Sequence, residues 1–173
     1  LIPFMIALSY REYFFPLYVE QFGIDEVQIG RIYLGCGVLV LYIGPYLSKG
    51  ILKILGAGKS ILFASLCMVF DMAIFVVVPN LYSVIIGMVL LAIVISFAYT
   101  CQYTYFEGLQ ECMIVGKGNA MGIYSMFENL GQTLGPVVYG AALMLGNRNG
   151  IGLLFVLMLM LVCLFWKVCL KRG

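Results

Sequence analysis

The 173-residue sequence contains no histidine, one tryptophan and few charged residues. Without histidine, the chain has no histidine-based catalysis, no histidine metal ligand and no histidine proton switch. Charged residues make up only 10% of the sequence, against about 25% in soluble domains, and 64% of the residues are hydrophobic. No arginine-rich run is present, so we expect no nucleic-acid partner. The composition predicts a polytopic protein embedded in a lipid bilayer.

The cysteines also lack the spacing of a redox or metal motif. None forms a C-x-x-C pair, and most lie inside apolar runs: Cys36, Cys67, Cys101, Cys112, Cys163 and Cys169. We interpret them as small apolar residues rather than as disulfides or metal ligands. The sequence therefore predicts no metal, no cofactor and no enzymatic activity.

Six apolar runs come near the roughly 20 residues that a helix needs to cross a bilayer. We place them at about 1–21, 27–47, 61–78, 81–106, 119–145 and 151–169. The predicted fold class is all-α, a bundle of six transmembrane helices. Leu1 lies inside an apolar run, so we expect a piece of a longer chain.

Basic residues alternate with the length of the connections between these runs. The long connections and the C-terminal end hold Lys49, Lys53, Lys59, Lys117, Lys167, Lys171 and Arg172, whereas Arg31 and Arg148 lie near short turns. Positive residues favour the cytoplasmic side. The pattern predicts a multi-pass protein of the cell membrane with both termini in the cytoplasm.

The run at 119–145 combines polar residues with glycine and proline. On a helical wheel, Tyr124, Gln132 and Tyr139 fall within about 40° of Glu128. The spacing Gly131-x-x-x-Gly135 is typical of membrane helices that approach each other closely. This face fits a packing surface between helices, and it also fits a moving helix that lines a polar path.

Polar side chains occur in other runs as well. Arg11 and Glu12 lie near the middle of the first run, where a charge is costly and therefore a functional candidate. The fourth run carries Tyr99, Gln102 and Tyr103. The third and sixth runs are almost wholly apolar, and the sixth should face lipid. Asp71 departs from that pattern, and we expect it to face the second run or another chain.

Two stretches resemble parts of the C-terminal half of a major facilitator superfamily transporter. One follows the second run and contains Gly44, Pro45, Lys49, Lys53, Gly58 and Lys59, with Leu52 where that family's motif usually has an acidic residue. The other contains Gly131, Gly135, Pro136 and Gly140 and is similar to the glycine–proline segment of the family's eleventh helix. The order of polar and apolar runs resembles the family over the whole chain.

This resemblance implies a function as well as a fold. The chain would be half of a twelve-helix transporter that moves a small solute by alternating access, with a missing N-terminal six-helix half or a second copy as its partner. Arg11 and Glu12 would bind the substrate or exchange a proton. Hydrogen bonds or coupling would come from Tyr99, Gln102, Tyr103, Glu128 and Gln132, and gating or packing from Gly44, Lys49, Lys53, Gly131, Gly135, Pro136 and Gly140.

Two alternatives to transport remain open, and three other classes of membrane protein do not fit the sequence. An Arg11–carboxylate pair could serve only to hold helices together. The same bundle, fused to a cytoplasmic signalling domain, could act as a membrane sensor or anchor. A rhomboid-type protease is excluded because it needs histidine, and the Asn-Pro-Ala elements of aquaporins and the threefold motif of mitochondrial carriers are absent.

Overall fold

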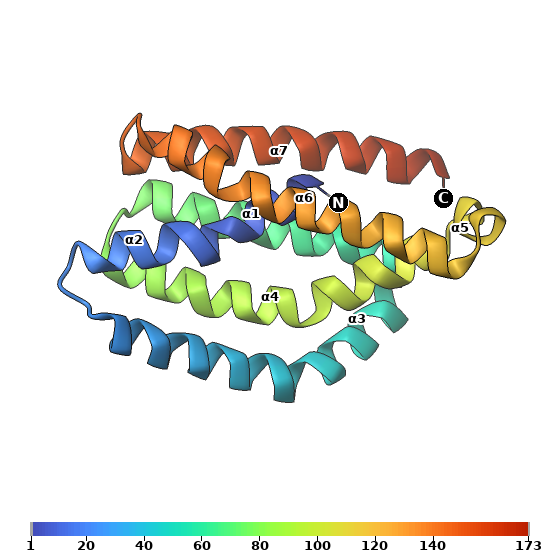
Figure 1. Ribbon diagram of the computed structural model, residues 1–173, viewed down its shortest axis with the longest axis horizontal. Coiled ribbons are helices and arrows are strands. Elements are labelled where there is room, and N and C mark those ends of the chain that lie inside the picture. The colour runs from blue at the N-terminus through green and yellow to red at the C-terminus, as the bar shows by residue number, and fades with distance from the viewer. Residues whose placement is uncertain (1, 173) are drawn as a thin grey trace.

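The computed structural model describes residues 2–172, and every regular element in that range is helical (Figure 1). Side chains are described except at positions 3, 10, 110, 111, 113, 147 and 168–172, so those of Cys169, Lys171 and Arg172 lie outside the described set. The elements are α1 (Ile2–Ser9), the π-helix η1 (Tyr10–Phe14), α2 (Phe15–Glu20), α3 (Glu26–Val77), α4 (Leu81–Glu107), α5 (Gln110–Val115), α6 (Lys117–Leu143) and α7 (Asn147–Arg172). The all-α prediction is confirmed for this range.

Three of the described helices are long and apolar enough to cross a membrane. They are α3, α4 and the Arg148–Lys167 part of α7. Between 28% and 56% of the most apolar window of each is buried inside the molecule, so much of their apolar surface faces outward. On α7 the outward side chains include Leu157, Met160 and Leu164. Such surfaces fit a location in a lipid bilayer.

The helix α3 reverses direction at Gly56. The connection expected between 47 and 61 is helical on both sides of Gly56, which alone has non-helical angles, φ 72° and ψ 166°. Glycine reaches positive φ without the steric penalty of a side chain. The prediction of a long loop here is therefore wrong. Ile51, Leu52 and Ile54 continue the helix, and the chain turns at a single residue.

The first helical run is broken near its middle. Its π-helical turn η1 contains Arg11 and Glu12, and Pro16 follows at the start of α2. Proline has no N–H and cannot donate to the carbonyl four residues earlier, which here belongs to Glu12. A wider π turn fits a helix that has lost this bond, and such turns recur at functional sites.

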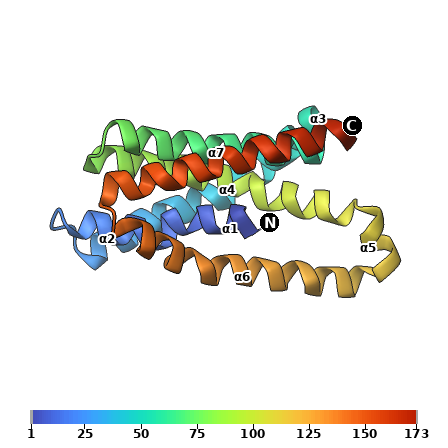
Figure 2. The ribbon, with the colours of Figure 1, turned by 90° about the horizontal axis from the view of Figure 1, so that it is seen from above.

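The helices form a bundle with two distinct ends. The reversal within α3, the short helix α5 and the C-terminal end of α7 lie at one end, and the three short connections lie at the other (Figures 1 and 2). Side-chain caps start two of the helices, because Asp25 accepts from the Gln28 N–H and Asn80 accepts from the Ser83 N–H, each at 2.8 Å. Because short and long connections alternate along the chain, the short connections lie together at one end of the bundle.

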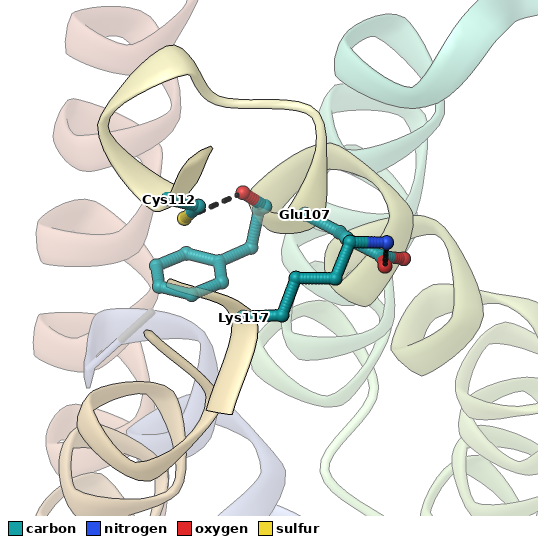
Figure 3. Close-up of polar contacts among 4 residues, drawn as sticks. Glu107, Cys112 and Lys117 are labelled. Carbon is teal, nitrogen blue, oxygen red and sulfur yellow. Dashed lines mark hydrogen bonds and ion pairs between the residues drawn. The ribbon is translucent and has the colours of Figure 1, made fainter. Parts of the chain in front are cut away.

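At each end of the bundle, a basic side chain links two helices. Lys117 at the start of α6 donates to Glu107 at the end of α4 at 2.8 Å (Figure 3). Because the two side chains are 77% and 40% exposed, this pair contributes little to stability. At the opposite end, Nε of Arg148 donates to the Val76 carbonyl at 2.9 Å, which ties α7 to α3.

Helix packing places small residues where backbones come closest. α3 packs against α4 and α7, and α1 packs against α6. A Cβ added at Gly131 of α6 would lie 2.5 Å from Cβ of Met5, and one at Gly135 would overlap the Ser9 hydroxyl. Between α3 and α4, a Cβ at Gly44 would lie 3.1 Å from the Ser96 carbonyl oxygen. A methyl group would clash at Gly131 and Gly135, and at Gly44 it would fit only if its neighbour shifted slightly.

The contact at Gly135 predicts a specific loss of stability. We expect Gly135→Ala to lower the free energy of unfolding by about 1–3 kcal/mol, because the new methyl group must displace Ser9 and with it α1. The measurement is the thermal midpoint of the purified protein. Gly122→Ala in the same helix is the matched control, since nothing lies within 4 Å of its Cβ position, and alanine gains up to about 1 kcal/mol there. Equal midpoints for the two variants would contradict this packing.

Candidate functional site

Several of the predicted site residues surround the Tyr99 side chain of α4. Tyr99 lies next to Gln132 of α6 and within electrostatic range of Glu128 of the same helix. The charges of Arg11 and Glu12 from η1 also act on its hydroxyl group. Three elements that are distant in sequence therefore contribute polar groups to one region, which we call the Tyr99 cluster: Arg11, Glu12, Tyr99, Glu128 and Gln132.

The Tyr99 cluster is accessible rather than sealed. Glu12 is exposed, and Arg11, Tyr99, Glu128 and Gln132 are half-buried. The cluster carries one guanidinium, two carboxyl groups, an amide and a phenol, so it can both donate and accept hydrogen bonds. Among the described side chains, the one ion pair of the protein is Lys117–Glu107, so Arg11 forms no salt bridge within the cluster.

Arg11 is held by an aromatic residue that the sequence did not single out. Its Cζ atom lies 5.4 Å from the centroid of the Tyr33 ring in α3, a cation–π distance. The Tyr33 hydroxyl donates to the Arg11 carbonyl oxygen, and Nε of Arg11 is buried without a hydrogen-bond partner among the described residues. The alternative of an Arg11–carboxylate pair finds no such pair among the described side chains.

Gln102 and Tyr103, the other predicted site residues of α4, both contact Tyr124 of α6. Gln102 is buried and accepts a hydrogen bond from the Tyr124 hydroxyl at 3.3 Å. It also lines a small cavity of about 140 Å³ with Phe4, Ile61 and Met158. Tyr103 is exposed and packs its ring edge-on against Tyr124, with centroids 6.1 Å apart. Gln102 therefore faces the core, and its partner Tyr124 is within electrostatic range of Glu128 and Tyr99 in the cluster.

The residues predicted for gating occupy two different places. Gly44 and Lys49 of α3 line an open hollow of about 420 Å³ together with Ser96 and Thr100 of α4. Lys53 is exposed and lies three residues before the reversal at Gly56. The hollow adjoins the α4 turn that carries Tyr99, so these residues lie near the cluster without entering it.

The glycine–proline segment of α6 packs mainly on the first run. Gly131 and Gly135 contact α1, and a Cβ at Gly140 would lie 3.6 Å from the Tyr13 hydroxyl of η1. Pro136 is exposed. Tyr139, placed with Glu128 by the helical wheel, is fully buried and donates to the Ala7 carbonyl at 3.4 Å. One side of α6 therefore packs on α1, and an adjacent side carries Glu128 and Gln132.

Asp71 is buried against α4. It is 2% exposed and rests against Gly87 of α4, where a Cβ would overlap Oδ1 and lie 3.1 Å from Cγ. This burial does not support the alternative of a contact with another chain, and the orientation toward the second run stays a prediction. The absence of a side chain at Gly87 makes room for this carboxyl group, a pairing that the sequence did not predict.

Tyr33 was missed because its role depends on a tertiary contact. It is an aromatic residue in a run of apolar residues, where packing is the ordinary interpretation. Tyr124, by contrast, was placed on the face of Glu128 by the helical wheel. The chain itself shows similarity to no family model, curated protein or solved structure.

The double contact of Tyr33 predicts a graded response to substitution. Tyr33→Phe keeps the ring under Arg11 and loses the hydrogen bond, so we expect a loss of about 0.5–1.5 kcal/mol. Tyr33→Leu also loses the cation–π contact, which adds about 0.5–2 kcal/mol. Thermal unfolding measures both, with Tyr46→Phe as control because Tyr46 is 81% exposed. If leucine and phenylalanine cost the same, the ring does not hold Arg11.

Proposed function

We propose that this chain is one six-helix half of a secondary membrane transporter, similar to those of the major facilitator superfamily, and that the Tyr99 cluster contacts the transported solute. The observation that supports it is the meeting of polar groups from η1, α4 and α6 in one accessible region of an otherwise apolar helical protein. Polar and ionisable groups at membrane depth are costly, and they mark substrate or ion pathways.

The proposed orientation follows from charge and from the two ends of the bundle. Lys53 and Lys59 flank the reversal of α3, and Lys117 begins α6, so the end with α5 carries most of the described lysines. Lys and Arg favour the cytoplasmic side of a membrane. We place the reversal of α3, α5 and the C-terminal end of α7 in the cytoplasm, and the three short connections outside.

The proposed solute is a small molecule with an anionic group. Arg11 is half-buried, its Nε has no hydrogen-bond partner among the described residues, and its planar guanidinium can bind a carboxylate or phosphate with two parallel hydrogen bonds. Tyr33 restrains the guanidinium in advance, which lowers the entropy lost on binding. Glu128, Gln132 and Tyr99 would then contact the rest of the solute.

Substitution of Arg11 tests this assignment. The purified chain, reconstituted in lipid vesicles, is exposed to a panel of small carboxylates, phosphates and neutral sugars, and binding and uptake are measured. Arg11→Gln should weaken binding of a carboxylate or phosphate by about 1.5–3 kcal/mol, or roughly 10- to 100-fold in Kd. Arg11→Lys keeps the charge without the planar fork and should fall between Gln and wild type.

The control for this experiment is Arg31→Gln, which removes an exposed arginine near the start of α3, about 200° around that helix from Tyr33. It should leave Kd unchanged. If Arg11→Gln lowers the folded yield while binding per folded molecule stays the same, Arg11 is structural and the solute does not contact it. Saturable binding without uptake, in vesicles that also hold any partner half, would favour a sensor over a transporter.

A further inference from the structure

The carboxyl group of Asp71 is the most isolated ionisable group in the described part of the chain. The residue is 2% exposed, and neither Oδ1 nor Oδ2 has a hydrogen-bond partner among the described residues. An ionised carboxylate in such a place costs several kcal/mol unless a cation or a set of donors compensates it. The bundle therefore needs either a ligand at this group or its neutral form.

Among the described residues, the helices around Asp71 supply no compensating charge. α4 presents Gly87, and its one acidic or basic residue is Glu107 at the far end. α6 presents Tyr139, which is within electrostatic range of Asp71, and α2 presents Tyr18, whose ring packs on Phe75 one turn further along α3. Arg148 of α7 is exposed and donates its Nε to the Val76 carbonyl.

A bound metal ion does not fit this environment. Hard cations such as Ca²⁺ and Mg²⁺ take about six or more oxygen ligands. Within the described residues, no group of three or more His, Cys, Asp or Glu side chains comes together. The contact with Gly87 also fills the space directly beside Oδ1. A proton is the ligand that neutralises the group and needs no further room.

We propose that Asp71 is a proton-binding site between α3 and α4. The packed bundle holds the side chain as the neutral carboxylic acid. When α3 and α4 separate at Gly87, water reaches the group, the O–H bond breaks, and the proton passes to that water. Packing of these two helices and occupancy by a proton are thereby coupled. The site is separate from the Tyr99 cluster and does not depend on the transport proposal.

The direct test is infrared spectroscopy at neutral pH of the purified protein in a detergent without ester groups, whose carbonyl band would otherwise overlap that of a carboxylic acid. A protonated carboxyl group has a carbonyl stretch that is resolved from carboxylate and amide bands and moves on exchange into D₂O. We expect this band in the wild type and its loss in Asp71→Asn, which has the shape of the neutral acid. Glu20→Gln is the matched control, because Glu20 is exposed and its removal should leave the band unchanged.

A wild-type spectrum without such a band at neutral pH would overturn the proposal, whatever the variant does. A band that persists in Asp71→Asn would also overturn it, since the proton would then belong to another group. Because no solute is added, neither outcome bears on whether the chain transports anything.

The pH dependence of unfolding gives an independent readout. The folded state would retain a proton that the unfolded chain loses above the ordinary carboxyl range of about 4. Stability therefore falls as pH rises from about 5 toward 7, by up to tenfold in the unfolding equilibrium per pH unit for one proton. We expect Asp71→Asn to remove that slope and Glu20→Gln to keep it. Parallel slopes in wild type and Asp71→Asn would contradict proton binding at Asp71.

Discussion

Close approach of helix backbones at glycine is the constraint on which the rest of this structure depends. In lipid, apolar side chains gain little by leaving their surroundings, so helices associate through tight packing between small residues. Gly131 and Gly135 let α6 settle on α1, and Gly44 and Gly87 let α3 and α4 meet. The polar groups of η1, α4 and α6 converge because these contacts fix the spacing of their helices.

The same contacts separate two kinds of polar site. The Tyr99 cluster stays accessible and mixes donors with acceptors, which suits recognition of a solute. Asp71 is sealed where α3 meets α4, which suits an ionisable group whose charge state depends on helix packing. A transporter needs both functions, since a bound solute must be linked to a change in helix arrangement. The proposals place the two functions on different faces of α4.

The sequence predicted the features that depend on composition and on helical periodicity. It did not predict features that depend on one contact between helices. The helical class follows from long apolar runs, and the polar residues of three runs were chosen because charge is rare in such runs. The prediction of a long loop after the second run was wrong, because α3 reverses its direction there at a single glycine. The partners of Arg11 and Asp71 were not foreseeable, since Tyr33 and Gly87 are ordinary residues until the helices are packed.

The convergence of α4 and α6 at the Tyr99 cluster is the central claim, and crosslinking in lipid measures it directly. In a background without cysteine, Tyr99→Cys is paired with Gln132→Cys and treated with a short bifunctional maleimide. Leu130→Cys replaces Gln132→Cys in the control pair, because it lies about 200° away around α6. Mass spectrometry should find the 99–132 link formed rapidly and the 99–130 link absent or slow. Equal rates, or the reverse order, would contradict the arrangement of polar groups described above.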